Sequence, residues 1–153
     1  MLLETIVSAP RKWKGKSTLH MSWLPMEERL RESDSTLEFD LGPQNNIVII
    51  RYNWDEKGPQ MGQILLALDG ELAQGGWMDS WHQSGAVMHL KGKVADPHTV
   101  SIQGTYSASP DPDWGWRISM KIMAEPNLLS IEMTNISPNG EEEWAVRSHY
   151  VPA

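Results

Sequence analysis

The chain of 153 residues contains no cysteine. This absence excludes disulfide bonds, thiol nucleophiles and metal centres with cysteine ligands. Aromatic residues other than tryptophan are also scarce, because three Tyr and one Phe stand beside eight Trp. Tryptophan combines a large apolar ring with one N–H donor, and nine Met add flexible apolar side chains. This composition fits a cavity lined by Trp and Met, and it fits equally a wide core that these residues fill.

Long hydrophobic runs and a positive net charge are absent as well. No stretch approaches the roughly 20 apolar residues of a membrane span, and residues 1–6 lack the basic start of a signal peptide. The net charge of −7 disfavours nucleic acid and anionic membranes as partners. The one basic cluster, at 11–16, is interpreted as the solvated end of a strand. We therefore predict a cytoplasmic protein with no nucleic-acid or membrane partner.

Turn signals rich in Gly, Pro, Asn and Asp recur at intervals typical of one strand and one hairpin turn. No long helical segment separates the strands, so neighbours should pair antiparallel rather than through parallel crossovers. A meander of this length has two exposed edges unless it closes on itself. We predict an all-β fold: one domain, 1–153, forming a closed antiparallel up-and-down barrel of about ten strands. The strands are expected near 13–23, 34–41, 45–54, 60–68, 76–82, 86–93, 98–107, 115–123, 127–135 and 141–150.

Two segments leave their structure open at this stage. Residues 1–11 form either a strand or a loose N-terminal arm that ends at Pro10. Residues 24–33 have a proline near their start and good helix formers after it, which favours a short capping helix. A loop leading into the next strand fits 24–33 equally well. The barrel should therefore contain at most one short helix.

Alternation along the strands predicts which side chains face the interior. Strands 45–54 and 60–68 are apolar on both faces, so their outer face should be covered by a partner subunit, as in a homodimer, or by the N-terminal arm. The predicted inward residues are Leu37, Phe39, Val48, Ile50, Tyr52, Trp54, Ile64, Leu66, Leu68, Val100, Ile102, Tyr106, Trp116, Ile118, Met120, Ile122, Trp144, Val146 and Tyr150.

The segment 75–85, with two Trp, an Asp and a His, carries the most unusual chemistry. If Ser84-Gly85 is a two-residue turn, Trp81 pairs with Met88, Asp79 with Leu90 and Trp77 with Gly92. This register places Trp77, Asp79 and Trp81 inside the barrel. It places Met78, Ser80, His82 and His89 outside.

A buried carboxylate needs a cation or strong hydrogen-bond donors, or it takes up a proton. The expected partners of Asp79 are Arg147, Arg117, Tyr106 and indole N–H groups. Asp79 then either orients a ligand or serves as a structural residue bonded to its neighbours. The predicted ligand-binding residues are Trp77, Asp79, Trp81, Met88, Tyr106, Trp116, Met120, Trp144 and Arg147.

Signals for other chemistry are weak. The five His form no close pair at metal-binding spacing, and no G-x-S-x-G nucleophile motif or phosphate-binding glycine loop occurs. No metal site or cofactor is therefore predicted from the residues themselves. His149 faces the cavity only if Arg147 and His149, rather than Val146, Ser148 and Tyr150, form the inward phase of the last strand.

Four motifs resemble a bacterial family of unknown function. They are Trp13-Lys14-Gly15, residues 77–82, residues 106–117 and residues 134–141, and the likeness extends over roughly 12–151. Proteins of that family are predicted calycin-like barrels. The resemblance implies a barrel of the lipocalin, fatty-acid-binding-protein and nitrobindin kind, and no established activity.

A second likeness is to nitrobindin-type haem barrels, which begin with Gly-x-Trp-x-Gly and ligate iron through a His near the C-terminus. Trp13-x-Gly15 and His149 are similar to these features, although position 11 is Arg where the pattern has glycine. This likeness implies a haem barrel with His149 as the iron ligand.

The main functional hypothesis is a non-enzymatic barrel that holds a small apolar or aromatic molecule among Trp and Met side chains. Two alternatives stay open. One is the His149-ligated haem barrel, and the other is a barrel isomerase or hydrolase that uses Asp79 as an acid or base.

Overall fold

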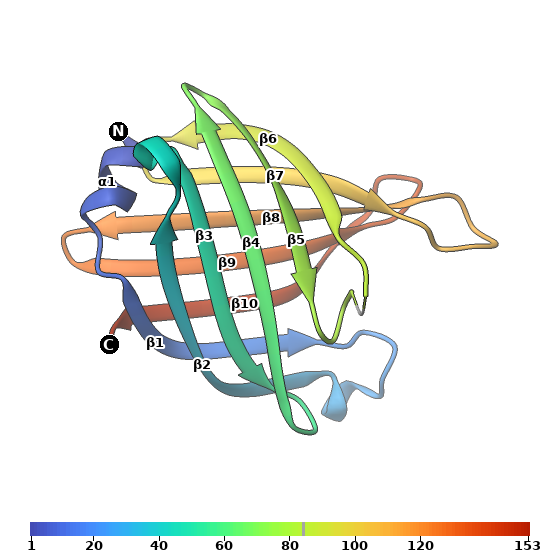
Figure 1. Cartoon of the computed structure of the whole chain (residues 1–153). Helices are drawn as coiled ribbons and strands as arrows, with labels where there is room; N and C mark the ends of the chain where they lie inside the picture. Colours follow the sequence, from blue (N-terminus) through green and yellow to red (C-terminus); the bar gives the residue numbers. More distant parts are fainter. Residues whose placement is uncertain (84) are drawn as a thin grey trace.

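The computed structural model describes residues 1–83 and 85–153, and ten antiparallel strands in it form a closed barrel. Each strand pairs with the next in sequence, and β10 returns to pair with β1 (Figure 1). This closure leaves no free sheet edge, which is the physical reason for predicting it. The strands are β1 (Lys12–His20), β2 (Leu30–Leu41), β3 (Ile47–Asp55), β4 (Pro59–Asp69), β5 (Leu72–Asp79), β6 (Met88–Asp96), β7 (Thr99–Tyr106), β8 (Trp114–Ala124), β9 (Asn127–Ile136) and β10 (Glu142–Pro152).

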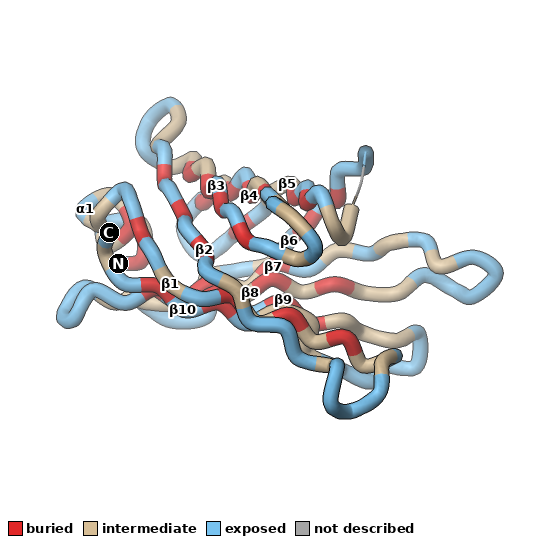
Figure 2. Tube along the Cα trace, turned by 90° about the horizontal axis from the view of Figure 1, so that it is seen from below, coloured by how far each residue is buried: buried red, intermediate tan, exposed pale blue. Residues whose placement is uncertain are grey.

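Burial alternates along the strands with a period of two, as Figure 2 shows. In β3, Val48, Ile50, Tyr52 and Trp54 are buried, while the residues between them are exposed or half-buried. The predicted inward phases of β2, β3, β4, β7 and β8 are confirmed by this pattern. Alternating side chains from the inner faces of all ten strands therefore build the core.

The N-terminal residues form a helix, α1 (Leu2–Ser8), so the expectation of a strand or a loose arm is wrong. Leu2 and Ile6 are four residues apart, share one helix face, and are 2% and 0% exposed. Arg11 then donates hydrogen bonds to the carbonyls of Ile6, Val7 and Ala9, which satisfies acceptors at the end of the helix. The helix lies at one end of the barrel (Figure 1) and closes it with apolar side chains.

The contribution of α1 can be measured with Ile6→Val, which removes one methylene from a fully buried side chain. We expect the free energy of unfolding to fall by about 0.5–1.5 kcal/mol. Urea denaturation followed by circular dichroism measures this change. Glu4→Gln, at an exposed position of the same helix, should change it by less than about 0.5 kcal/mol. Equal stability of the Ile6→Val variant and the original protein would contradict the packing role of α1.

The opposite end of the barrel carries the loops that join β1 to β2, β5 to β6, β7 to β8 and β9 to β10 (Figure 1). Within 24–33, Met26–Glu28 form one turn of 3₁₀ helix and β2 begins at Leu30. The segment thus contains both a short helical turn and the approach to the next strand, so each of the two alternatives is partly correct. A second 3₁₀ turn, Pro43–Asn45, joins β2 to β3. No helix in the described parts of the chain has the length and apolar character needed to cross a membrane.

Part of the outer face of β3 and β4 is apolar, as the sequence indicates, and α1 does not cover this part. Leu65 is 45% exposed there, and Ile47, Ile49 and Ala67 are half-buried. Since α1 lies at the barrel end, the N-terminal arm is excluded as the cover of this face. A homodimer through 45–54 and 60–68 stays a prediction.

Candidate functional site

The site begins at Asp79, the last residue of β5. The sequence had predicted that this strand continues to residue 82. One carboxylate oxygen of Asp79, Oδ1, accepts the backbone N–H groups of Trp81 at 2.9 Å and His82 at 3.0 Å. The carbonyl of Asp79 accepts the N–H of Gln83 at 2.9 Å. A short acidic side chain that takes up the next backbone donors stabilises a turn against continuation of a strand. The turn directs His82 back toward the barrel interior.

The register between β5 and β6 therefore differs from the prediction. Trp77 lies opposite Met88 instead of Gly92, and Gly75 instead of Asp79 lies opposite Leu90. Ser84, one half of the predicted two-residue turn, lies outside the described residues. The register shift is four positions, an even number, so the faces of the strands are unchanged. For this reason Trp77 and Asp79 point inward as predicted, at 1% and 3% exposure, in spite of the wrong register.

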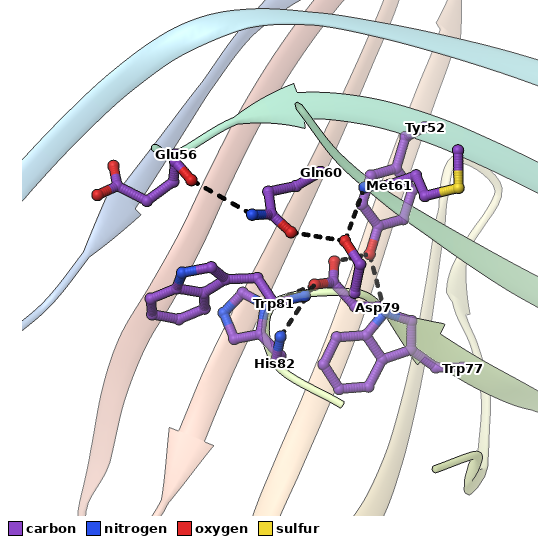
Figure 3. Close-up of polar contacts among 9 residues, drawn as sticks. Tyr52, Glu56, Gln60, Met61, Trp77, Asp79, Trp81 and His82 are labelled. Carbon is purple, nitrogen blue, oxygen red and sulfur yellow. Dashed lines mark hydrogen bonds and ion pairs between the residues drawn. The ribbon is translucent and has the colours of Figure 1, made fainter. Parts of the chain in front are cut away.

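Asp79 is the centre of a buried hydrogen-bond network (Figure 3). The Tyr52 hydroxyl donates to Oδ2 of Asp79 at 2.8 Å, and the indole N–H of Trp77 donates to the Tyr52 oxygen at 2.9 Å. On the other side, Nδ1 of His82 lies 3.2 Å from Oδ1 of Asp79. Of the predicted donors only an indole takes part, and it acts through Tyr52.

The other predicted partners of Asp79 are bound elsewhere. Arg147 donates to Glu132 at 2.8 Å, Arg117 forms two 2.7 Å hydrogen bonds to Glu142, and Tyr106 donates to Asn135. Both arginines project to the outer side of the barrel wall. Arg147 of β10 pairs there with Glu132 of the neighbouring β9, and Arg117 of β8 reaches across β9 to Glu142 of β10. The prediction that they compensate the charge of Asp79 is wrong.

The network keeps Asp79 ionised and Tyr52 protonated. Burial raises the pKa of Asp79, but the His82 hydrogen bond and charge, the backbone N–H of His82 and the Tyr52 hydroxyl outweigh it, so this pKa lies below the usual value. The pKa of Tyr52 lies well above its usual value. Burial is the largest cause, and the negative charge of Asp79 is the second. Asp79 is therefore a hydrogen-bond acceptor only, and His82 must present N–H at Nδ1 to it.

The imidazole of His82 lies among four indoles, contrary to the prediction that it faces outward. Its side chain is 12% exposed. Its ring centroid is 4.7 Å from Trp81, 5.3 Å from Trp116, 5.8 Å from Trp77 and 5.9 Å from Trp54. With its proton at Nδ1, neutral His82 has a lone pair at Nε2, and among the described residues no hydrogen-bond partner reaches that atom.

A pocket of about 230 Å³ lies at the loop-bearing end of the barrel, and we call it the mouth pocket. Its wall is rich in aromatic rings: Trp77 and Trp116 stack at 5.0 Å, and Trp23 and Trp81 at 6.3 Å. It contains six of the nine predicted ligand-binding residues. The lining residues are Leu19, His20, Ser22, Trp23, Trp77, Trp81, His82, Gln83, Met88, Tyr106, Trp116, Asn135, Glu143, Trp144 and Ala145.

A second, inner cavity lies behind His82, toward the barrel centre. It measures about 20 Å³ as space open to the centre of a water molecule, which is room for roughly one water. Leu19 and His82 line both the inner cavity and the mouth pocket and so form the partition between them. The other lining residues of the inner cavity are Ser17, Tyr52, Trp54, Asp79, Ile131, Met133, Val146, Ser148 and Tyr150.

The remaining predicted site residues lie away from the mouth pocket. Met120 is a core residue at 3% exposure. Arg147 is exposed, and its guanidinium lies 4.3 Å from the ring centroid of Trp144. His149 is exposed on the outer face of β10, because Ser148 and Tyr150 take the inward positions after an irregularity between Trp144 and Val146. The expectation that Arg147 points inward is wrong, and His149 has the outward orientation.

Several residues of the mouth pocket escaped sequence analysis, namely His20, Trp23 and His82. His20 is the last residue of β1, where its Nδ1–H donates to the carbonyl of Trp144 and its ring stacks on the Trp144 ring at 4.6 Å. This is a contact between segments far apart in the sequence. The signal for His82 was present in the Asp-Ser-Trp-His order, since Asp at a strand end commonly caps a turn. Among the described residues, no group of three or more His, Asp or Glu side chains is arranged to hold a metal ion.

Comparison with known proteins identifies the architecture. No family model matches the chain, and no curated protein matches it. The crystal structure of Rv2717c from M. tuberculosis is similar over 99% of this chain and 97% of that one, with a TM-score of 0.71 and 10% sequence identity. The crystal structure of a putative thioesterase II from Thermobifida fusca YX aligns over 95% of this chain and 79% of that one, at 5% identity, but its TM-score of 0.26 is too low to indicate a common fold. The chain, a closed barrel of ten strands in the residues that the structure describes, therefore shares its fold with Rv2717c.

Proposed function

We propose that the protein binds a small aromatic molecule, and that the mouth pocket is the binding site. The observation that carries this proposal is the concentration of indole rings around one open pocket at the barrel end. Flat aromatic walls favour flat apolar ligands, because stacking and edge contacts add to the gain from burying apolar surface.

The volumes of the inner cavity and the mouth pocket distinguish which of these two spaces could hold the ligand. The inner cavity of about 20 Å³ has no room for an organic molecule, because core side chains fill the barrel centre. The mouth pocket of about 230 Å³ is smaller than the roughly 300–1,000 Å³ of drug-sized sites, so it suits molecules of one or two rings. We therefore expect the ligand at the barrel end and not in the filled barrel centre.

The alternative of a haem barrel depends on His149 as the iron ligand. That side chain lies on the outer face of β10, away from the mouth pocket and the inner cavity. Haem ligation by His149 would therefore have to use the separate pocket that His149 lines on the outside of the barrel wall. Three further expectations stay predictions. They are the membership of a bacterial family of calycin-like proteins, the cytoplasmic location, and the homodimer through strands 45–54 and 60–68.

Nitrobenzene is a suitable probe, since it is a flat, uncharged single ring that quenches tryptophan fluorescence. We expect saturable quenching when it is titrated into the protein. Trp81→Ala should weaken this binding by about 0.5–1.5 kcal/mol, which is roughly twofold to tenfold in Kd, because one stacking wall is lost. Trp81 is half-buried and lies in a loop, so this variant should keep the fold.

The matched control is Leu72→Ala, which removes an exposed apolar side chain at the first residue of β5, outside the mouth pocket. It should leave the Kd for nitrobenzene unchanged. Quenching that rises linearly without saturation, or that is identical in Trp81→Ala, would overturn the proposal. Native mass spectrometry of the purified protein would in addition identify the class of any molecule that it retains.

A further inference from the structure

We propose that the mouth pocket prefers aromatic molecules that carry an acidic hydroxyl, of the phenol class, and that Nε2 of His82 takes up the hydroxyl proton. This inference rests on the proposed function, because it concerns the ligand of the same pocket. It goes beyond aromatic shape and assigns a chemical group to one wall of the site. His82 is the residue that links the pocket to the buried charge behind it.

The first argument is the orientation of His82. Asp79 accepts from Nδ1 of His82 at 3.2 Å, and three further donors hold the carboxylate in place: the Tyr52 hydroxyl and the backbone N–H groups of Trp81 and His82. This arrangement fixes the tautomer with the lone pair on Nε2. His82 lines the mouth pocket, and no described residue bonds that lone pair, so a ligand hydroxyl is a suitable donor for it.

The second argument is an unpaired donor on the same wall. Trp116 is 5% exposed and lines the mouth pocket, and its indole N–H is buried without an acceptor among the described residues. A buried donor without a partner costs roughly 1–3 kcal/mol. The neighbouring Trp77 has its N–H on Tyr52, so the two stacked indoles differ in this respect. An oxygen atom brought by a ligand would supply the missing acceptor.

The proton transfer itself is balanced within the site. The O–H bond of the ligand breaks, an N–H bond forms at Nε2, and the ligand oxygen keeps the electron pair as a phenolate. The imidazolium then lies between the carboxylate of Asp79 and the phenolate. Four indoles, whose ring centroids lie 4.7–5.9 Å from the imidazole, surround it and favour a cation at this position. The total charge of ligand and site is unchanged.

Other titratable groups also face the mouth pocket. They are His20 of β1, Tyr106 of β7 and Glu143 of β10, while Tyr52 of β3 lies behind Asp79. The His20 Nδ1 is bound to the Trp144 carbonyl and lies 3.8 Å from Glu143, whose side chain is 53% exposed. Tyr106 donates its hydroxyl proton to Asn135. Because Glu143 is half-exposed, water screens its charge and weakens its effect on His20. His82, in contrast, has the buried carboxylate of Asp79 behind it, so we assign the proton to His82.

The test compares 4-nitrophenol with nitrobenzene, two rings of similar size of which only the first has an acidic hydroxyl. The ionised form of 4-nitrophenol is yellow, so visible absorption reports directly on the protonation state of the bound molecule. At a pH below the solution pKa of the phenol, we expect the bound molecule to be ionised to a larger extent than the free one. We expect about tenfold tighter binding of 4-nitrophenol than of nitrobenzene.

The decisive variant is His82→Gln, which keeps a donor for Asp79 but has no comparable base. Its affinity for 4-nitrophenol relative to nitrobenzene should fall to a ratio of about one, and the bound phenol should be neutral. His89→Gln is the matched control, because this His is exposed on the outer side of β6. It should behave like the unaltered protein. The absorption of 4-nitrophenol bound to the unaltered protein gives a second readout that needs no variant.

Each other outcome has a distinct meaning. If both probes bind equally and bound 4-nitrophenol stays neutral, the inference about His82 is overturned while the proposed function stands. If 4-nitrophenol is bound as the phenolate in His82→Gln as well, another group takes the proton and the assignment to His82 is overturned. If neither probe binds, the proposed function and the inference both fall.

Discussion

Replacing Asp79 with leucine is expected to lower the free energy of unfolding by about 3–5 kcal/mol. The substitution removes the shared acceptor of the Tyr52 hydroxyl, the Nδ1–H of His82 and the backbone N–H groups that begin the turn after β5. Leucine is apolar and of similar size, so the loss measured is that of the network and not of volume. Urea denaturation followed by tryptophan fluorescence gives the value. A loss below about 1 kcal/mol would show that the donors find water instead.

The charge of Asp79 can be separated from its shape by comparing the original protein with Asp79→Asn across acidic pH. The pKa of this carboxyl is lower in the folded protein than its ordinary value of 3.8. The unfolded chain therefore takes up the proton first as the pH falls, so the ionised group stabilises the fold above pH 3.8 and loses this contribution as the pH falls through the folded-state pKa. The stability difference between the two proteins should be constant near neutral pH and shrink in acid. Parallel stability curves down to pH 3 would contradict it.

Replacing Gly62 with alanine is expected to cost about 2–4 kcal/mol, which is large for the addition of one methyl group. Gly62 of β4 lies opposite Tyr52 on one side and opposite Asp79 on the other. The Tyr52 ring passes over Gly62 to reach Asp79, and a Cβ at this position would lie 2.1 Å from both Cζ and Oη of Tyr52. The ring must move, and its hydrogen bonds to Asp79 and from Trp77 are then lost.

Gly76→Ala is the matched control for this substitution. Gly76 lies in the neighbouring strand β5, and the nearest atom to its added Cβ is Cγ1 of Val87 at 3.5 Å, an ordinary contact. Its unfolding free energy should change by no more than about 0.5 kcal/mol. A double-mutant cycle with Tyr52→Phe provides a further check, since the Tyr52 hydroxyl should contribute little once the ring is displaced. Additive effects of the two substitutions would contradict the steric explanation.

The barrel could be predicted from the sequence because two local signals agree along most of its length. Alternation in segments such as Val48, Ile50, Tyr52 and Trp54 fixes the inner face, and the turn residues fix the strand number. Closure followed from the cost of free edges. The helix α1 was missed because seven residues give only two i, i+4 apolar pairs, Leu2 with Ile6 and Leu3 with Val7. Its stability comes from the barrel end on which the buried pair, Leu2 and Ile6, packs.

Only part of the candidate site was predicted correctly, and the pairing register of β5 and β6 explains which part. Trp77 and Asp79 were assigned to the correct face because an error of four positions preserves the faces of a strand. His82 was assigned wrongly because strand alternation was extended past Asp79, where the carboxylate stabilises a turn instead. Trp23 stacks on Trp81 from a different loop, and such a contact depends on the folded barrel and has no signature in either segment.

The seam between β1 and β10 has a consequence for how the chain folds. It places Trp13 opposite Pro152 and Gly15 opposite Tyr150, so the last pairing of the sheet joins the two ends of the sequence. Bringing such distant residues together costs more chain entropy than forming any of the nine hairpin pairings between sequential strands. Contacts of this range slow folding, and until they form both edge strands present unpaired backbone groups to other copies of the chain. We therefore expect the pairing of β1 with β10 to be the slowest and most aggregation-sensitive stage of folding.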